Sequence, residues 1–508
     1  MKKILIATNW EVGQSNVCLA VAHALVQANP TVEVHFASFE PVRAAFNVTA
    51  DHAQQCSPEA KPIVFHKLAG KSMVDSLMEA EPVTHLFEIM SKPPTFYRKL
   101  QVISRIMRTL LPWTVDDFVE VYDSLADLVT NQVKPDLVVV DCLFSPGLTV
   151  CAHLKVNHVV ISPNTVKDFS VSSQPRGGFL WKYPGTATAF PFPVPWYLIP
   201  VNIFLILVQI FYMITDKQAK ETVNAIRKLT GGAEMVGMQH VAGPPMKPGE
   251  KRTKIVVGCR PEIDFPLEVI PDYVIPCGPI VRAVKPVAAV DPDLDVWLKK
   301  GPTVFLALGS HIDLTEKEAL EVAKAFKRLF DAANERGVDE IGGVQGKLQV
   351  FWKLQKKEDQ GEYGWEKGSM IWEVLGKEMD ADRLRITKWV KPEPAAVMQT
   401  GNVVCVANHG GANSYYDAVT TGIPQVSLPV WFDCYDFGSR VEILNIGKWG
   451  NKRAMPRSTA EELGSALIEV VLERHSEYKA NVSKLAAVCN KVPGAEVAAA
   501  AILAEVGN

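Results

Sequence analysis

The sequence predicts an α/β chain with two Rossmann-like, doubly wound parallel-sheet domains that face each other across a cleft. Three observations support this fold class. A strand–helix–strand pattern opens the chain between Ile4 and Ser38, and another lies between Asn402 and Gly450. Between them, the stretch 261–292 is rich in proline and has few periodic apolar positions, as expected near a connection between domains. With 508 residues, the chain is long enough for two or three domains.

The expected domain boundaries follow from these shifts in composition. The first domain should cover 1–282, a linker 283–298 and the second domain 299–475. Amphipathic helices at 476–508 should close the chain and pack back toward the first domain.

In the first domain, the apolar run from Ile4 to Asn9 predicts a strand, and Ser15 is expected to cap the helix that follows a loop at 11–14. Leu137 to Asp141 is a β-branched, buried strand with a carboxylate at its carboxyl end. In open α/β sheets that end faces the ligand crevice, so Asp141 is a candidate site residue. Further elements are expected at 32–38 (strand), 145–154 (helix), 158–161 (strand) and 255–258 (strand).

The most apolar run in the chain is 201–214, and it follows an aromatic, proline-rich stretch that starts at Phe169. The run is shorter than the ~20 residues that span a bilayer, and Asn202 and Gln209 interrupt it. A buried or pocket-lining helix is the first interpretation. A peripheral contact with a membrane surface is the second, and a true span is the third.

In the second domain, 303–308 and 348–353 read as strands, and Thr315 with Glu318 forms a capping box for the helix between them. The charged stretch 355–382 reads as an insertion or surface excursion. From 402 onward the chain again reads as a strand, a tight glycine turn, a short helix and a strand.

That glycine turn is His409-Gly410-Gly411, and Asn413 and Ser414 open the short helix after it. A helix start reached through glycines is a ready anion site, because its free N–H groups and its dipole face the ligand. The stretch is therefore expected to hold a phosphate.

Composition excludes several classes of partner and places the chain in a reducing compartment. The formal net charge is −3 and no basic stripe occurs, which argues against nucleic acid. Nine scattered cysteines contain no Cys-x-x-Cys pair, which favours reduced thiols in a cytoplasmic protein over disulfides or zinc. The first apolar run is too short for a signal peptide.

The stretch from Trp389 to Asp436 resembles the signature of the family 1 UDP-glycosyltransferases, which have the GT-B fold. The matching positions are His409, Gly411, Asn413, Ser414, Asp417, Gly422, Pro424, Pro429 and Asp433, without a gap. The segments 11–14 and 433–437 look like those of fungal members. The resemblance implies a UDP-dependent hexosyltransferase of secondary metabolism.

The resemblance also implies the donor site. Trp389 would stack on uracil, Asp417 would accept the ribose hydroxyls and Asp433 would hold the hydroxyls of the sugar. The full set of expected donor-binding residues is Ser310, Trp389, Val390, His409, Gly411, Asn413, Ser414, Asp417, Asp433 and Cys434. No metal or other cofactor is expected, because helix-terminal donors would stabilise the departing UDP.

The expected catalytic base departs from the family pattern. The family carries a His after Gly in the first loop, whereas Gly13 is followed by Gln14, and an amide cannot take a proton at neutral pH. Three explanations stay open: a carboxylate, Glu11 or Asp141, takes the proton; the reaction needs little base strength; or the chain binds a nucleotide sugar without transferring it. His311 is a further candidate near the leaving phosphate.

The identity of the sugar is also open, because Ala412 and Cys434 replace the family's Trp and Gln. The expected reaction is an inverting transfer of a hexose, with glucose as the expected sugar, from a UDP-sugar to a hydroxyl of a lipophilic small molecule. Polyketides, terpenoids, sterols and glycolipids are the acceptor types considered. The alternative is a nucleotide-sugar-binding protein that lacks the usual base.

Overall fold

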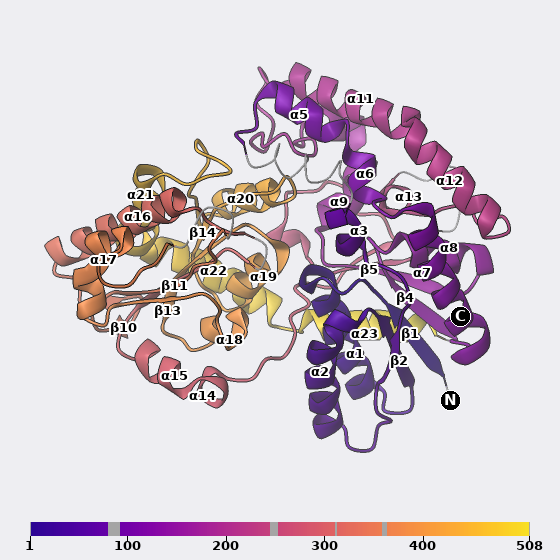
Figure 1. Cartoon of the computed structure of the whole chain (residues 1–508), viewed down its shortest axis with the longest axis horizontal. Helices are drawn as coiled ribbons and strands as arrows, with labels where there is room; N and C mark the ends of the chain where they lie inside the picture. The colour runs from indigo at the N-terminus through magenta and orange to yellow at the C-terminus, as the bar shows by residue number, and fades with distance from the viewer. Residues whose placement is uncertain (1, 80–91, 244–251, 310–311, 358–362, 507–508) are drawn as a thin grey trace. The chain divides into compact units, whose positions relative to one another are not determined.

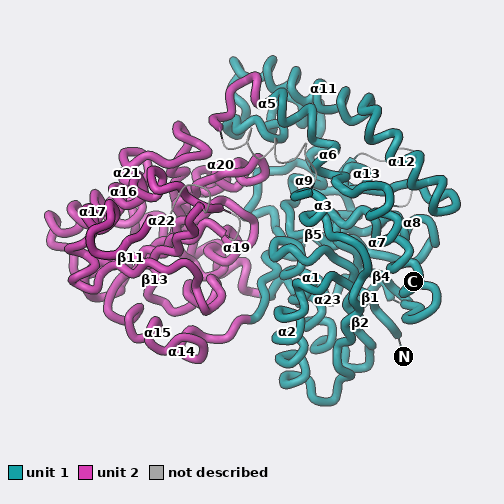
Figure 2. Tube along the Cα trace, in the orientation of Figure 1, with its two compact units in different colours: residues 1–89, 99–283, 492–508 teal, residues 90–98, 284–491 magenta. Residues whose placement is uncertain are grey.

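The chain folds into two α/β units, each built on its own parallel sheet (Figures 1 and 2). The computed structural model describes residues 2–79, 92–243, 252–309, 312–357 and 363–506. Unit 1 comprises Met1–Ile89, Lys99–Ala283 and Val492–Asn508, and unit 2 comprises Met90–Arg98 and Val284–Lys491. The prediction of two doubly wound parallel-sheet domains is confirmed.

Unit 1 contains a seven-stranded sheet of order β3-β2-β1-β4-β5-β6-β7, in which every pair is parallel. The strands are β1 (Lys3–Ala7), β2 (Glu33–Ser38), β3 (Val64–Lys67), β4 (Leu137–Asp141), β5 (His158–Ser162), β6 (Ile255–Val257) and β7 (Val274–Pro276). The central strand β4 is buried at all five positions, as its β-branched sequence predicts. The sequence did not predict β3 and β7, because edge strands are short and only partly buried.

Helices α1, α2 and α23 pack with the central strands and enclose the core of unit 1. Its helices and helical turns are α1 (Val12–Ala28), η1 (Glu40–Val42), α2 (Arg43–Cys56), α3 (Met73–Glu79), α6 (Ile106–Leu110), α7 (Val115–Asp127), η2 (Leu128–Gln132), α8 (Ser145–Leu154), α9 (Val166–Ser170), η3 (Val171–Ser173), η4 (Pro175–Gly177), α10 (Gly178–Trp181), α11 (Ile199–Thr215), α12 (Lys217–Leu229), α13 (Met238–Ala242), η5 (Pro261–Ile263) and α23 (Gly494–Glu505). The helix α5 (Phe96–Ile103) contains the residue at which the chain passes from unit 2 to unit 1.

The first helix starts earlier than the sequence predicted. Helix α1 begins at Val12, directly after Glu11, so the stretch 11–14 is not a loop and Gln14 lies in the first helical turn. Ser15 does not cap the helix; its Oγ donates to the carbonyl oxygens of Trp10 and Glu11. A serine inside a helix can satisfy its hydroxyl on the preceding turn in this way, which makes its capping signal ambiguous in sequence.

Unit 2 contains a six-stranded sheet of order β12-β11-β8-β13-β14-β15, again parallel throughout. The strands are β8 (Thr303–Ala307), β11 (Gln349–Lys353), β12 (Leu384–Thr387), β13 (Val403–Asn408), β14 (Gln425–Ser427) and β15 (Gly447–Trp449). A short antiparallel ribbon pairs β9 (Glu340–Ile341) with β10 (Val344–Gln345).

Helices cover both faces of this sheet and give unit 2 two apolar clusters. They are α14 (Val287–Val290), α15 (Pro292–Leu298), α16 (Glu316–Glu335), α17 (Met370–Asp380), α18 (Pro394–Met398), α19 (Ala412–Thr420), α20 (Cys434–Ile443), α21 (Ala460–Ile468), η7 (Glu469–Glu473) and α22 (His475–Cys489). The predicted capping box at the start of α16 is confirmed: Thr315 Oγ1 accepts from Glu318 N, and Glu318 Oε2 accepts from Thr315 N.

Three sequence segments differ from their expected roles. The stretch 283–298 carries α14 and α15, and Trp297 and Leu298 are fully buried within unit 2. The stretch 355–382 is not only a surface excursion, because α17 inserts Ile371 and Leu375 into the core. Of the C-terminal helices, α22 packs in unit 2 and α23 packs on α1 in unit 1.

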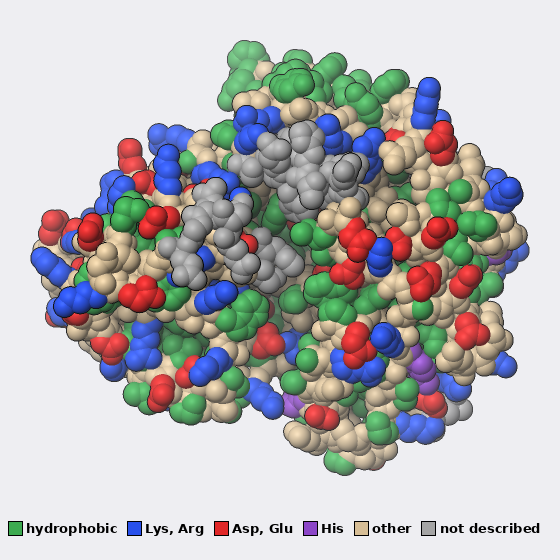
Figure 3. Space-filling view, viewed as in Figure 1, with side chains coloured by type: hydrophobic (Ala, Val, Ile, Leu, Met, Phe, Trp, Pro, Cys, Tyr) green, Lys and Arg blue, Asp and Glu red, His purple; other side chains and the backbone are tan. Residues whose placement is uncertain are grey.

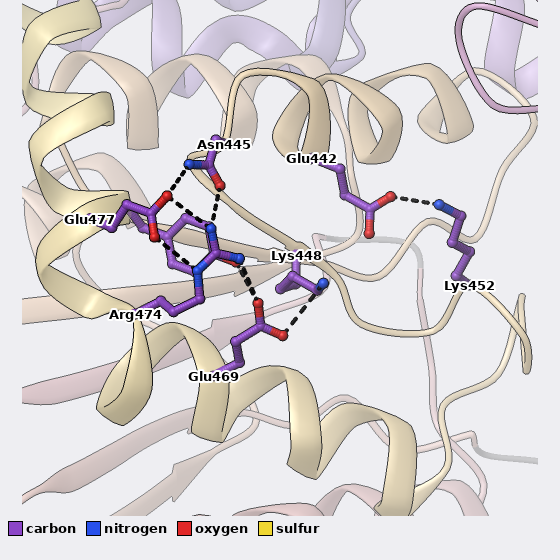
Figure 4. A network of polar contacts seen from close by, with 8 residues as sticks. Glu442, Asn445, Lys448, Lys452, Glu469, Arg474 and Glu477 are labelled. Carbon is purple, nitrogen blue, oxygen red and sulfur yellow. Dashed lines mark hydrogen bonds and ion pairs between the residues drawn. The ribbon is translucent and has the colours of Figure 1, made fainter.

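A network of charged side chains fixes the start of α22 within unit 2 (Figure 4). The guanidinium of Arg474 donates to Asn445, Glu469 and Glu477, and also to the hydroxyl of Tyr478. A second ion pair joins Lys448 to Glu469. Because the members share partners, the network restricts several side chains together, which isolated surface pairs do not achieve.

The apolar run 201–214 forms α11, and the interpretation as a buried helix is wrong. Only Asn202 and Leu205 are buried, whereas Leu207, Phe211 and Ile214 are 53, 60 and 62% exposed. Asn202 fixes the helix: its Nδ2 donates to the carbonyls of Leu180 and Tyr183, and its Oδ1 accepts from Gly185 N. The helix is therefore held along one side and turns an apolar side outward.

By length and composition, α11 with α12 passes as a bent candidate for a membrane span, with a 41° bend between the two helices. Within the described ranges the segment His475–Glu505 also passes. Ala498, Ala499 and Ile502 in that segment are fully buried in unit 1, which is typical of a core helix.

We expect Asn202→Ala to lower the free energy of local opening of residues 180–205 by about 3 kcal/mol, because three buried backbone groups lose their partner. Amide hydrogen exchange of this segment measures the effect. The control is Asn224→Ala on α12, where the side chain is exposed. Unchanged protection in Asn202→Ala would show that α11 is held by other contacts.

Candidate active site

In both sheets the order of the strands reverses at one place, which is where open α/β sheets bind ligands. In unit 1 the reversal lies between β1 and β4, and in unit 2 it lies between β8 and β13. Asp141 ends β4, and Glu11 follows β1. His409 follows β13, and Gly309 follows β8. The candidate residues of each unit therefore gather at the carboxyl edge of its own sheet.

Asp141 is buried and fully engaged. Its side chain is 1% exposed, Oδ2 accepts from Thr8 Oγ1 at 3.0 Å, and Oδ1 accepts from Leu143 N at 2.9 Å. Burial raises the pKa of this carboxyl to about 6, against the lowering effect of the hydrogen bonds. Since the side chain is buried and both oxygens already accept hydrogen bonds from the protein, Asp141 is placed to fix the local structure.

Glu11 is partly exposed, and only one of its oxygens is engaged. Oε1 accepts from Ser72 Oγ at 3.0 Å and from Val74 N at 2.9 Å, whereas Oε2 is buried without a hydrogen-bond partner among the described residues. Burial raises the pKa of Glu11 to about 7, and the nearby charge of Asp141 adds a smaller increase. A carboxyl with such a pKa can exchange a proton near neutral pH.

Two residues near Glu11 in the chain also have buried polar atoms without a hydrogen-bond partner among the described residues. Asn9 Oδ1 accepts from Met73 N at 3.2 Å, but Asn9 Nδ2 has no partner in the described part of the chain. The same holds for Oε1 of Gln14 in the first turn of α1. Buried polar atoms are usually paired, so three such atoms in six residues mark a place where water or a polar ligand would supply the partners.

In unit 2, the turn between β13 and α19 has the geometry of an anion site. Gly410 adopts φ +77°, and its N–H donates to Asn408 Oδ1 at 2.8 Å. A Cβ at Gly410 would lie 3.1 Å from both Cys434 O and Ser427 Oγ, so the close approach requires glycine. Gly411 is the N-cap of α19. The first backbone N–H groups of a helix have no partner within the helix, so they can bind an anion.

The other expected phosphate ligands lie around this turn. His409 packs against Gly309, where a Cβ would come within 3.0 Å of His409 Cε1. Asn413 and Ser414 occupy the first turn of α19, and Asp417 follows Asn413 by one turn on the same side. All are partly exposed. Ser310 and His311 lie outside the described residues.

The residues expected to contact the sugar separate into an exposed one and a buried one. Asp433 is exposed and precedes α20 as its N-cap. Cys434 is 1% exposed, lies against Gly410, and burial raises the pKa of its thiol well above the usual range. Cys434 therefore shapes the turn by packing, and Asp433 is the member of the pair that a ligand can reach.

Trp389 and Val390 follow the edge strand β12 and border a cavity of about 440 Å³ inside unit 2. Trp389 is 60% exposed, and the ammonium of Lys353 lies 4.0 Å from its ring centroid. Lys353 Nζ also donates to Gly309 O at 2.7 Å. The cavity lining further includes Phe351, Trp365, Trp372, Ile386 and Thr387. The turn before α19 does not line this cavity.

The sequence did not single out Lys353, Thr8 and Asn408. Their side chains form hydrogen bonds with Gly309, Asp141 and Gly410, respectively. One signal was available for Lys353, because a lysine at the carboxyl end of a buried parallel strand is unusual. Thr8 and Asn408 are short polar residues directly after apolar strands, a pattern that is common in turns without any function.

One group of possible metal ligands occurs among the residues that the structure describes. His23 on α1 and His52 and Cys56 on α2 have ligand atoms within 4.8 Å of one another. His23 lies about 16 Å along α1 from its start beside Glu11. The group is therefore separate from the candidate site residues of unit 1.

Comparison with known proteins gives one family. Residues 367–501 match the family model described as UDP-glucoronosyl and UDP-glucosyl transferase. The glycosyltransferase sdnJ of Sordaria araneosa is 29% identical over 96% of this chain and 94% of its own length. A UDP-glycosyltransferase of Talaromyces amestolkiae is 25% identical over 44% of this chain and 40% of its own length.

Solved structures show the same fold over the whole chain. The glycotransferase of kitacinnamycin superposes with a TM-score of 0.61 at 16% identity, covering 99% of both chains. A UDP-glucosyltransferase from Polygonum tinctorium superposes with a TM-score of 0.62 at 13% identity, covering 99% of this chain and 98% of that one. The chain has the GT-B fold, and the family match, the curated relatives and the solved structures together support a family 1 UDP-glycosyltransferase that uses a UDP-sugar.

Proposed function

We propose that the protein transfers a hexose, with glucose as the first candidate, from a UDP-sugar to a hydroxyl of a lipophilic small molecule, with inversion at the anomeric carbon. A polyketide, terpenoid, sterol or glycolipid is the acceptor type we favour. The observation that carries the proposal is the unengaged, buried Glu11 oxygen at the switch point of unit 1, since a transferase needs a base there.

Two named relatives support a lipophilic acceptor. The rat 2-hydroxyacylsphingosine 1-beta-galactosyltransferase is 24% identical over 35% of this chain and 32% of its own length. The Polygonum tinctorium enzyme is described as glucosylating indoxyl. The aromatic, apolar stretch 169–212 of unit 1 agrees with such an acceptor, because it offers apolar surface.

For the donor, we propose that Trp389 stacks on uracil, with Val390 beside it, and that Asp417 accepts both ribose hydroxyls. His409, Asn413, Ser414 and Ser310 would contact the diphosphate at the start of α19, and Asp433 would hold sugar hydroxyls. A carboxylate suits a vicinal diol, and N–H groups at a helix start suit the charge that develops on departing UDP. On this reading the transfer requires no metal.

For the base, we favour Glu11 over Asp141, because Glu11 has a free acceptor atom and Asp141 has none. The acceptor oxygen attacks the anomeric carbon while its proton passes to Glu11 Oε2. The new carbon–oxygen bond forms as the bond to UDP breaks, and UDP leaves with that electron pair. Asp141 would act as a positioning residue through Thr8.

We also propose that residues 201–214 contact a membrane surface peripherally. Hydrophobic side chains gather over α11 (Figure 3), and the helix contains no charged residue. Trp196 and Tyr197, just before α11, are 82 and 61% exposed, and such aromatic residues favour the membrane interface. The following α12 carries Lys217 and Lys220, both exposed, which an anionic surface would attract. The nine free cysteines support a cytoplasmic location.

We expect a new glycosylated product when the protein is incubated with UDP-glucose and a panel of apolar alcohols and phenols. Mass spectrometry of the reaction mixture detects it, and UDP-galactose and UDP-N-acetylglucosamine serve as donor controls. Transfer only to peptides or soluble sugars would rule out the lipophilic acceptor. UDP binding without turnover across the panel would favour a nucleotide-sugar-binding protein instead.

We expect Glu11→Gln to lower kcat/KM by about 100- to 10,000-fold, because an amide cannot accept the proton. Asp141→Asn should cost about tenfold, since it changes only positioning. The raised pKa of Glu11 means that its carboxylate dominates only above about pH 7, so kcat/KM of the unaltered enzyme should rise with pH and level off there.

A second variant, Gln14→His, tests the position at which the family carries its base. In the Glu11→Gln background it should restore part of the activity through an imidazole in the first turn of α1. If Glu11→Gln keeps full activity and the same pH profile, Glu11 is not the base.

We expect the protein to co-sediment with vesicles of phosphatidylcholine and phosphatidylserine, and the double change Phe204→Glu and Phe211→Glu to weaken this binding at least tenfold. Both phenylalanines are exposed on α11. The matched control is Val296→Glu on α15, where the side chain is 63% exposed in unit 2. Equal binding of the three proteins, or none, would contradict the membrane contact.

A further inference from the structure

Lys353 is a lysine in a place where lysines rarely occur. It is the last residue of β11, next to the switch-point strand β8, and it is 9% exposed. Lysine is almost never buried unless a partner of opposite charge accompanies it, because the ammonium loses its hydration. Burial lowers the pKa of Lys353, and the charge of Asp313 acts in the opposite direction.

The described contacts of Lys353 leave its charge without a counterion. Its Nζ donates to Gly309 O at 2.7 Å and lies 4.0 Å from the centroid of the Trp389 ring. A carbonyl and an aromatic face attract a cation, but neither carries a negative charge. Within the described residues no carboxylate forms an ion pair with it. Lys391, which also borders the Trp389 cavity, has Asp291 at 3.9 Å.

A chain of contacts within unit 2 connects this ammonium to the anion site. Gly309, whose carbonyl accepts from Lys353, packs directly against His409. His409 in turn lies against Gly411, the N-cap of α19. Lys353 thus lies between the tryptophan expected under the uracil and the helix start expected to hold phosphate.

We infer that Lys353 is a donor-binding residue whose ammonium pairs with the diphosphate of the UDP-sugar. The inference rests on the proposed binding of a UDP-sugar in unit 2. The nucleotide supplies the missing negative charge, and in a partly dehydrated place the pair gains more than it would in water. A second consequence is that the unliganded protein holds this charge at a cost to its stability.

The test compares ligands that differ only in phosphate charge. Isothermal titration of uridine, UMP and UDP is carried out with the unaltered protein, Lys353→Met and Lys353→Arg. Lys353→Met should leave uridine affinity within about twofold and weaken UDP about 10- to 100-fold, with UMP between them. Lys353→Arg should keep most of the affinity for UDP, because the charge remains.

Lys299→Met is the matched control and should bind UDP like the unaltered protein, since its ammonium pairs with Asp295 at 2.6 Å and it does not border the Trp389 cavity. Unliganded Lys353→Met should keep its circular dichroism spectrum and melt at the same or a higher temperature than the unaltered protein. Equal losses for uridine and UDP would mean that Lys353 only supports Trp389, which overturns the inference. If the unaltered protein binds no UDP, the proposed donor site itself is wrong, and the inference falls with it.

Discussion

The parallel sheet is the constraint on which both units depend. Its central strands are buried on both faces, so they are mainly apolar runs, and their polar residues lie at the strand ends, as Asp141, Thr303 and Asn408 do. Because all strands in a parallel sheet point the same way, their carboxyl ends meet at one edge. The order of strands reverses once in each sheet, and the turns on the two sides of that reversal diverge to leave room for a ligand. Glu11 and Asp141 in unit 1, and Gly309 and His409 in unit 2, owe their positions to this arrangement.

Burial then determines the chemistry of these edges. In unit 1 it raises the pKa of two carboxyl groups, and these two groups differ in their hydrogen bonds. Both oxygens of Asp141 accept hydrogen bonds, from Thr8 and from a backbone N–H, whereas Oε2 of Glu11 has no partner among the described residues. In unit 2 burial acts on a cation, Lys353, whose hydrogen-bond and aromatic partners, Gly309 and Trp389, are both neutral. The raised pKa of Glu11 and the lowered pKa of Lys353 therefore have the same cause, the removal of water from ionisable groups.

The helix α11 is apolar in sequence, yet only Asn202 and Leu205 of its residues are buried. A single amide, that of Asn202, satisfies three backbone groups of the loop 180–185 and secures the helix along one side. Leu205 is buried beside it, whereas Leu207, Phe211 and Ile214 face outward, where a protein surface normally carries polar residues. The apolar composition of 201–214 predicted a buried helix, but the helix is largely exposed. The hydrogen bonds of Asn202 hold it in that position.

The sequence by itself determined the fold class, most of the central strands and the donor motif, because these depend on local patterns: β-branched runs, glycine turns and fixed spacing. It also showed that the family's usual base is absent, since Gln14 stands where the family has histidine. Only the tertiary structure shows how the surroundings of Glu11 and Asp141 differ, because the difference lies in hydrogen bonds from Ser72, Val74, Thr8 and Leu143, which come from other segments. It also decided the exposure of α11 and the place of Lys353. Burial and pairing are properties of neighbours that are distant in the chain, so no local pattern records them.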